Sequence, residues 1–342
     1  MNVLVTGGAG YIGSHAVRRL LQGRHDVTVV DNLCRGHEQA VLKPARFEKL
    51  DIRDTDALIR VMKRDGTECV MHFAALAYVG ESVEQPLTYY DNNTAGSASL
   101  LRAIDAAGVK RMVFSSTCAT YGQPPPELIP IAETTPQKPI NPYGWSKLFV
   151  ERMLIDYANA PAPGSSACKD FAFAALRYFN VAGSAGDGSI GEDHDPETHI
   201  IPVLLNAALG KIPGATIFGT DYDTPDGTCI RDYVHVEDLV DAHVVVMEAL
   251  NPGADDPRKR QRFYNLGTGN GLSVKTIVEA VKQVTGINFK VNIGPRRPGD
   301  PPTLYANPQK IQDELGWEAR HKDAKTMVEH AWAWFQKHPD GY

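Results

Sequence analysis

Cysteine is scarce in this sequence, and the few that occur form no recognisable pattern. There are five in 342 residues, and no two of them form a Cys-x-x-Cys pair. An odd, dispersed set argues against both a disulfide framework and a cysteine zinc site. We therefore expect reduced thiols and no bound metal. The five are Cys34, Cys69, Cys118, Cys168 and Cys229.

Long apolar runs and an excess of basic charge are also missing. No run approaches the ~18 residues of a membrane span, and no basic segment precedes an apolar one at the start of the chain. We expect no membrane partner, no signal peptide and a cytoplasmic location. The net charge of −6 argues against non-specific binding to nucleic acid. The hydrophobic fraction of 43% and the charged fraction of 22% are typical of a globular chain with one large or two intimate domains.

Glycine, in contrast, is placed with a regular spacing near the start of the chain. Gly7, Gly10 and Gly13 lie between the apolar run at 2–6 and a stretch at 12–22 with helical spacing. A turn of this kind lets the backbone approach a pyrophosphate, which then rests against the N–H groups at the helix start. The strand before the glycines and the helix after them indicate a dinucleotide-binding turn.

An acidic residue follows the glycines at the distance that such a turn requires. Asp31 ends the second apolar run, at 27–30, about 20 residues after the turn. Its carboxylate suits two ribose hydroxyls and would repel a 2′-phosphate, which favours NAD over NADP. Arg35 is a nearby cation, and we interpret it as a solvated loop residue.

A phenol and an ammonium group four residues apart suggest proton transfer. Tyr143 and Lys147 would lie on one face of a helix. A free tyrosine titrates near pH ~10, so it acts as a base at neutral pH only if a neighbouring cation stabilises the phenolate. The spacing alone also fits an ordinary buried aromatic beside a solvated lysine, and it is the glycine turn that favours a reactive pair beside a nicotinamide.

Strands and helices alternate through the first half of the chain. We expect an α/β fold with a Rossmann-type, doubly wound parallel sheet and a smaller C-terminal α/β substrate domain. Expected strands lie at 2–6, 27–30, 46–51, 69–73 and 111–115, and expected helices at 54–64, 86–107 and 143–158. We interpret 124–142 as a proline-rich surface loop, and 160–169 and 251–262 as exposed insertions.

Several motifs occur together and in order along the whole chain. Besides the glycine turn and Tyr143-x-x-x-Lys147, they include Ser115-Ser116-Thr117, the segment 227–235 and Arg296-Arg297-Pro298-Gly299-Asp300. With these motifs the sequence resembles the extended branch of the short-chain dehydrogenase/reductase family, and within it the sugar-nucleotide 4-epimerases.

The resemblance implies a reaction and its catalytic residues. Tyr143, held as phenolate by Lys147, would take the proton of the sugar 4-hydroxyl while carbon 4 gives its hydride to NAD. Thr117 would hydrogen-bond that hydroxyl. The implied products are the two 4-epimers of a UDP-sugar, UDP-glucose and UDP-galactose, formed through a 4-keto intermediate with NAD regenerated in each cycle.

The resemblance also implies two sets of binding residues. Those for NAD are Gly7, Gly10, Tyr11, Ile12, Gly13, Asp31, Asn32, Asp51, Ile52, Phe73, Ala74, Ala75, Asn92, Tyr143, Lys147 and Tyr178. Those for the UDP-sugar are Thr117, Asn180, His199, Ile200, Phe218, Arg231, Arg297 and Asp300. Arg231 and Arg297 would hold the diphosphate, because a guanidinium supplies several planar donors.

The sequence departs from the family pattern at a few positions. Ala77 stands where many relatives have a lysine, and Leu304 stands where a residue limits the space at carbon 2 of the sugar. His199 replaces a usual asparagine, which puts its side-chain role in doubt. Thr117-Cys118-Ala119 lacks the acidic pair that sugar-nucleotide dehydratases use after their threonine, so water elimination has no obvious catalyst.

Alternatives remain for the substrate and for the class of protein. Segments at 77–80 and 116–122 also resemble UDP-arabinose (UDP-xylose) 4-epimerases, and the residue at 304 leaves UDP-N-acetylglucosamine open. A non-catalytic NAD-sensing protein would be expected to have a damaged Tyr-x-x-x-Lys pair, whereas this pair is intact. We expect residues 1–179 to bind NAD, with 230–250 returning to that domain, and residues 180–342 to bind the UDP-sugar.

A homodimer is the expected assembly. In the resembled family the helices at 86–107 and 143–157 form the interface between the two subunits. Both helices carry apolar residues on more than the one face that would pack inside their own subunit. Those expected to contribute to the two apolar faces are Leu100, Leu101, Ile104, Leu148, Phe149, Met153 and Leu154.

Overall fold

The computed structural model describes residues 1–160, 170–297 and 300–342. The chain divides into two compact units, each assembled from three stretches. The first unit contains 1–122, 136–177 and 240–264, and the second contains 123–135, 178–239 and 265–342. The expected insertion at 160–169 lies, apart from its first residue, outside the described residues.

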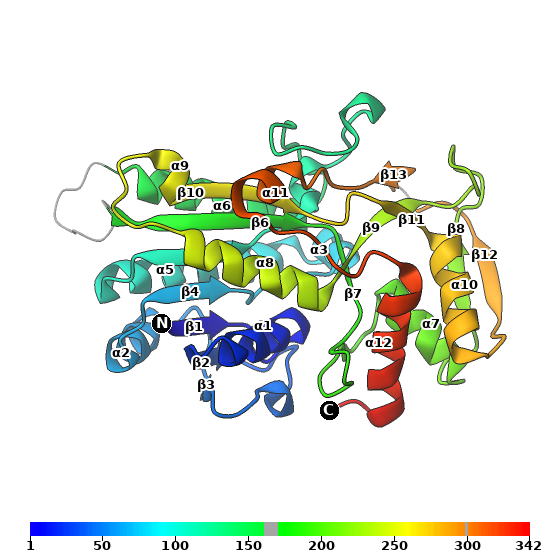
Figure 1. The fold of residues 1–342 in the computed structure, drawn as a ribbon, viewed down its shortest axis with the longest axis horizontal. Helices are drawn as coiled ribbons and strands as arrows, with labels where there is room; N and C mark the ends of the chain where they lie inside the picture. Colours follow the sequence, from blue (N-terminus) through cyan, green and yellow to red (C-terminus); the bar gives the residue numbers. More distant parts are fainter. Residues whose placement is uncertain (161–169, 298–299) are drawn as a thin grey trace. The chain divides into compact units, whose positions relative to one another are not determined.

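A seven-stranded sheet in the order β10-β6-β5-β4-β1-β2-β3 organises the first unit (Figure 1). The pairs from β3 through β6 are parallel, and Val5 of β1 lies opposite Val29 on one side and Met71 on the other. This confirms the expected doubly wound α/β sheet. The strands are β1 Asn2–Thr6, β2 Asp26–Asp31, β3 Arg46–Lys49, β4 Cys69–His72, β5 Arg111–Ser115, β6 Ala172–Tyr178 and β10 Gln261–Leu266.

Helices cover both faces of this sheet because successive strand residues point to opposite sides. Leu4 and Met112 belong to an apolar core that they share with α2, α5 and α6. On the other face lie α1 and α8, joined by an ion pair between Arg19 and Asp241 (Figure 1). The helices are α1 Tyr11–Gln22, α2 Thr55–Asp65, α3 Val79–Glu84, α4 Pro86–Tyr89, α5 Gly96–Ala107, α6 Pro142–Ala158, α8 Val236–Ala249 and α9 Pro257–Arg260.

The second unit contains short strands and a separate core. Strand β9 pairs with β11, β13 and β7, and β8 pairs with β12. Ile277 of α10, Met327 of α12 and Leu205 of α7 are fully buried in the core of this unit. Its elements are β7 Asn180–Ala182, α7 Ile200–Ala208, β8 Ala215–Phe218, β9 Ile230–His235, β11 Gly271–Ser273, α10 Val274–Thr285, β12 Val291–Gly294, β13 Thr303–Leu304, α11 Gln309–Leu315 and α12 Ala324–Lys337.

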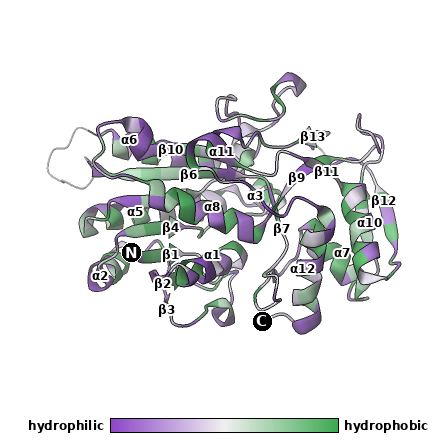
Figure 2. Ribbon diagram, in the orientation of Figure 1, coloured by the Kyte–Doolittle hydropathy of each residue, from purple (hydrophilic) through white to green (hydrophobic). Residues whose placement is uncertain are grey.

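Hydropathy follows these layers. In Figure 2 the strands of the central sheet are mainly hydrophobic, whereas several helices are hydrophobic on one side and hydrophilic on the other. Polar side chains cap the N-termini of several helices. Asp54 accepts the Ala57 N–H at the start of α2, and Asn141 accepts the Gly144 N–H at the start of α6. Within the described residues, no helix has both the length and the apolar character needed to cross a membrane.

Several expectations about local structure need correction. The helix expected at 86–107 contains a π-helical segment, Tyr90–Ala95, between α4 and α5. The loop at 124–142 is not wholly on the surface, because Ile131 is fully buried and bridges to Ala306. The stretch 251–262 contains α9 and the first residues of β10.

The side chains expected on a dimer face are also partly misassigned. Leu100, Leu101, Ile104 and Leu154 are buried in the core of their own unit, because they contact the central sheet and α2. Of the other three, Leu148 and Met153 are partly buried and Phe149 is 42% exposed. The apolar surface of α6 is therefore narrower than the sequence indicated.

A buried ion pair fixes α6 to the sheet. The Glu151 carboxylate accepts hydrogen bonds from Arg177 of β6 at 2.7 and 2.9 Å, and from Ser116 at 2.5 Å. The side chains of Arg177 and Glu151 are 5% and 1% exposed. Arg177 also donates to the Tyr121 hydroxyl at 2.8 Å. With its hydrogen bonds satisfied, the pair holds α6 in one position.

We predict that Glu151→Leu lowers the free energy of unfolding by about 3–5 kcal/mol, because the Arg177 charge stays buried without a counterion. The double variant Glu151→Leu/Arg177→Met should recover most of that loss, since both charges are gone. Urea denaturation measures both. As a control, Lys110→Met removes an exposed pair with Asp170 and should cost under about 1 kcal/mol. A Glu151→Leu variant as stable as the wild type would contradict the prediction.

Candidate active site

The glycine turn between β1 and α1 leaves no room for side chains. Gly7 has φ +73°, and a Cβ added there would lie 2.5 Å from the Ala74 nitrogen. A Cβ on Gly13 would lie 2.0 Å from the Gly7 carbonyl oxygen. The close approach lets α1 begin directly beside the end of β1, as a dinucleotide-binding turn requires.

The turn fits a dinucleotide pyrophosphate. Gly10 precedes the first turn of α1, and among the described residues no side chain caps that turn. Tyr11 and Ile12 form the first turn itself, where N–H groups and the helix dipole favour an anion. The sequence-predicted residues of this region are therefore brought together at one helix start.

Asp31 ends β2 beside the same turn. Its carboxylate accepts the Ala9 N–H at 3.1 Å and the Leu33 N–H at 2.8 Å. Burial raises the pKa of Asp31, against the opposing effect of these two hydrogen bonds. Each carboxylate oxygen has two lone pairs, so the group can still accept bonds from ribose hydroxyls.

Arg35 is not the solvated residue that we expected. Its guanidinium forms an ion pair with Glu81 at 2.8 Å and lies 5.0 Å from the centre of the Tyr78 ring. A carboxylate therefore already neutralises this cation, which makes it a poor partner for a 2′-phosphate. The arrangement is consistent with NAD.

The next two strand ends carry further predicted residues. Asn32 donates to the Asp51 carboxylate at 2.9 Å, so these two side chains meet near the ends of β2 and β3. Hydrogen bonds from Arg53 lower the pKa of Asp51, although burial acts in the opposite direction. Ile52 beside them is 5% exposed.

The loop after β4 is tied to α6 through Asn93. Phe73 and Ala74 both donate backbone bonds to the Thr6 carbonyl, and Ala75 follows them. Asn93 accepts the Leu76 N–H at 2.9 Å and donates to Ser146 of α6 at 3.0 Å. The predicted Asn92 donates to Asn93 at 2.9 Å. Sequence reasoning chose Asn92 and missed the positioning role of Asn93, whose partners are distant in the chain.

The candidate catalytic residues all belong to the first unit. Tyr143 and Lys147 occupy successive turns of α6 and are 8% and 3% exposed. The Lys147 ammonium donates to the Ser115 carbonyl at 2.8 Å. Burial lowers the pKa of Lys147 to about 7. No sequence pattern signals the Ser115 contact, because a backbone carbonyl can accept from any side chain that reaches it.

Thr117 lies just beyond the end of β5. Its side-chain oxygen accepts the Ala119 N–H at 3.1 Å, which leaves the hydroxyl proton to be donated elsewhere. The side chain is 6% exposed. This geometry suits a hydroxyl that hydrogen-bonds a substrate oxygen.

The residues predicted for the nucleotide sugar belong to the second unit, apart from Thr117. Arg231 of β9 forms an ion pair with Asp300, and the Arg297 guanidinium lies 4.2 Å from the centre of the Phe218 ring. Asn180 of β7 lies opposite Tyr233, also of β9. The fold thus brings the predicted residues together as two pairs, and Asn180 belongs to the strand next to Arg231.

The structure supports the doubt about the His199 side chain. His199 precedes α7, which begins at Ile200, and its Nδ1 lies 2.7 Å from a Glu192 oxygen. Tyr178, predicted near the nicotinamide, is the last residue of β6. Leu304 lies opposite Arg231 where β13 pairs with β9.

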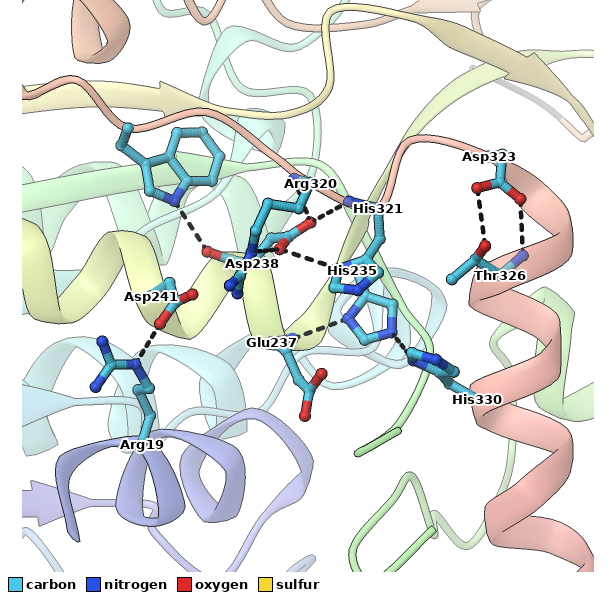
Figure 3. A network of polar contacts seen from close by, with 11 residues as sticks. Arg19, His235, Glu237, Asp238, Asp241, Arg320, His321, Asp323, Thr326 and His330 are labelled. Atoms are coloured by element: carbon cyan, nitrogen blue, oxygen red, sulfur yellow. Dashed lines mark hydrogen bonds and ion pairs between the residues drawn. The ribbon is translucent and has the colours of Figure 1, made fainter. Parts of the chain in front are cut away.

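A polar network fixes the end of β9, the strand that carries Arg231 (Figure 3). His235 accepts the Glu237 N–H at 3.1 Å, and its other ring nitrogen lies 3.0 Å from His330 of α12. The buried Asp238 carboxylate accepts the N–H groups of Arg320 and His321 at 2.9 and 2.8 Å. These bonds hold the start of α8 in the second unit.

Comparisons with known proteins agree with this geometry. The UDP-glucose 4-epimerase of Lacticaseibacillus casei is 47% identical over 342 residues, covering 100% of this chain and 99% of the relative. The probable UDP-arabinose 4-epimerase 1 of Oryza sativa subsp. japonica is 48% identical over 354 residues, covering 100% and 81%. The crystal structure of UDP-glucose 4-epimerase from Brucella ovis in complex with NAD has a TM-score of 0.90 and 45% identity, covering 97% and 98%.

A family match covers the glycine turn, the Tyr143 helix and the β9 strand. The match runs from residue 3 to residue 267. Together with relatives that align over their full length or most of it, it shows that the chain belongs to the NAD dependent epimerase/dehydratase family.

Proposed function

We propose that the chain is a UDP-glucose 4-epimerase, an isomerase that uses NAD. The observation that carries this proposal is that Thr117, Tyr143 and Lys147 are all present and belong to the same folded unit as the glycine turn. Relatives named UDP-glucose 4-epimerase align with the whole chain, which supports the same reaction.

Tyr143 is the proposed base. NAD, held at the glycine turn and Asp31, would supply the acceptor for the hydride of carbon 4 and the donor that returns it to the opposite face. Tyr143 takes the proton of the 4-hydroxyl and later gives it back. Thr117 donates its hydroxyl proton to the same sugar oxygen and so keeps that oxygen near the phenol.

Lys147 makes this role possible at neutral pH. Alone in its buried site the ammonium has a pKa near 7, because burial disfavours its charge. A neighbouring phenolate favours the charged form, and the Ser115 carbonyl keeps the ammonium in place. The cation in turn lowers the cost of ionising Tyr143.

The family also contains dehydratases, and this site does not suit them. Cys118 and Ala119 follow Thr117, where elimination would need an acid and a base. The chemistry available is therefore oxidation and reduction at one carbon, which is what epimerisation at carbon 4 requires.

The proposed nucleotide site is in the second unit. Arg231 and Arg297 bind the diphosphate, with Asn180 assisting, Phe218 packs near uracil and Asp300 binds the ribose. Arg231 and Asp300 form an ion pair, so two of the residues assigned to the nucleotide lie together. Ile200 and the His199 backbone complete the set.

A pentose is the second candidate substrate, and a specific observation favours it. The rice relative named a probable UDP-arabinose 4-epimerase is as similar as those named for glucose. Comparing kcat/KM for UDP-glucose and UDP-arabinose on the same preparation distinguishes the two. A higher value with the pentose would replace the hexose in our proposal.

We also propose a homodimer that uses α6 and the helical stretch 86–107. The rings of Trp145 and Phe149 on α6 have their centres 5.7 Å apart, and the two residues are 39% and 42% exposed. Tyr90 contacts Phe149 at 6.0 Å, and Leu87 is 80% exposed. A cluster of exposed apolar side chains of this kind is typical of an interface.

Tyr143→Phe should abolish most epimerisation and keep NAD bound. The variant loses the phenol proton acceptor while the ring keeps its contacts, so turnover should fall by about 10²–10⁴-fold. A coupled assay of UDP-galactose conversion measures turnover, and absorbance of the denatured supernatant measures bound dinucleotide. Near-normal turnover would remove Tyr143 from its assigned role.

Arg231→Ala and Arg297→Ala should each weaken UDP-sugar binding by about 1.5–3 kcal/mol, because a charge-assisted contact to the diphosphate is lost. Calorimetric titration with UDP measures this. Arg296→Ala is a matched control, because Arg296 precedes Arg297 in the chain but is not assigned to the diphosphate; it pairs with Asp221 and lies over Tyr222. Equal losses in the control and in the two variants would contradict the assignment.

Light scattering tests the dimer. We expect a mass about twice the 37.4 kDa of the chain, and a monomer for Trp145→Glu/Phe149→Glu, because charge would be buried in the interface. Ile293 is an apolar residue outside the proposed interface and is 71% exposed, so Ile293→Glu should leave the dimer intact. A monomeric wild type, or a dimeric double variant, would disprove the proposed interface.

A further inference from the structure

Two glutamates and two histidines gather in the segment between β7 and α7. They are Glu192, His194, Glu197 and His199, and one nitrogen or oxygen atom of each lies within 4.8 Å of the others. No two of them are adjacent in sequence, so the loop must fold back to bring them together. The proposed function uses the backbone of His199 but none of the four side chains.

The distances between the glutamate oxygens and the histidine nitrogens are close to those in a tetrahedral metal site. Two ligands about 2.0–2.1 Å from a zinc ion, at the tetrahedral angle, lie about 3.3 Å apart. A Glu192 oxygen lies 2.7 Å from the His199 Nδ1 and 3.2 Å from the His194 Nδ1. Oxygens of Glu197 lie 3.4 Å from the His199 Nδ1 and 3.7 Å from the His194 Nδ1. An ion at the centre would need only small side-chain shifts.

The backbone around the cluster is held by other contacts. The Glu192 carbonyl accepts a hydrogen bond from Trp334 of α12 at 3.2 Å, and the Gly191 N–H donates to the Tyr342 hydroxyl at 3.0 Å. A Cβ on Gly191 would lie 2.2 Å from the Trp334 ring, so the chain passes directly over the indole. These contacts position the ligands independently of any ion.

The charge of the cluster also favours a cation. The side chains of Glu192 and Glu197 are 5% and 11% exposed, so two carboxylates lie close together with little water. Two carboxylates in one cluster leave a negative charge that a divalent cation would balance, once both imidazoles are neutral and bind it.

We propose that Glu192, His194, Glu197 and His199 bind one Zn²⁺ ion. Imidazole nitrogen and carboxylate oxygen are both good zinc ligands, and four protein ligands make a closed, structural site. The ion fixes the loop that leads into α7, because His199 is the residue before that helix. It takes no part in the reaction.

A second group of possible ligands, His235, Glu237 and His330, fits an ion less well (Figure 3). One nitrogen of His235 already accepts the Glu237 N–H, and the other lies 3.0 Å from His330. This group has only three residues, and both ring nitrogens of His235 are already in contact with other atoms. We therefore use it as the internal control.

Zinc binding is tested on the full chain purified without a metal-affinity tag and treated with a chelator. Competition with a chromophoric chelator, using zinc chloride, should show one ion per chain at micromolar or lower concentration, and zinc should raise the Tm. His194→Gln should weaken binding by more than about tenfold, since loss of even an outer-shell partner costs that much. His194→Gln/His199→Gln should bind no zinc.

His330→Gln should keep the full equivalent of zinc. Far-ultraviolet circular dichroism shows whether each variant is folded. If the double variant is unfolded, Co²⁺ is bound to the wild type in place of zinc. The visible absorption of Co²⁺ then reports tetrahedral nitrogen and oxygen ligands directly. No binding to the wild type at micromolar zinc would overturn the proposal, as would full binding to a folded double variant or loss of binding in His330→Gln.

Discussion

The contact on which the first unit most depends is the buried Glu151 carboxylate. Tyr143, Lys147 and Glu151 are spaced four residues apart on α6, so they lie along one face of the helix. Glu151 binds Arg177 of β6 and Ser116 at the end of β5, and this fixes the same face against the sheet. The rotation of α6, and with it the direction of the phenol and the ammonium, therefore depends on a residue outside the proposed chemistry.

Much of this fold was predictable from the sequence because its signals are local. The alternation of apolar strands and amphipathic helices, the glycine turn and the Tyr143–Lys147 spacing each involve neighbouring residues. The contacts that were missed join distant residues: Asn93 with Ser146, Glu151 with Arg177, and Arg35 with Glu81. No periodicity reports such pairs, since each exists only after the sheet has brought its elements together.

The same reason explains the errors about exposure. Ile131 lies in a proline-rich stretch that looks like a surface loop, but its burial depends on Ala306, 175 positions away in the chain. Leu100 and Ile104 look available to a partner until the central sheet covers them. Glu192 and His199 likewise converge only through the folding of their loop, which no local pattern in the sequence reports.

The interleaving of the two units affects how the chain can fold during synthesis. The first unit needs residues 240–264, which supply Asp241, the ion-pair partner of Arg19 in α1, and most of the edge strand β10. The second needs residues 265–342, including Trp334 in its core. A ribosome that delivers the chain from its amino end therefore completes the first unit only after Tyr264 has emerged, when about half of the second has already been made. Neither unit can be completed from a single uninterrupted stretch, so the two must mature together, although N-terminal domains usually fold first.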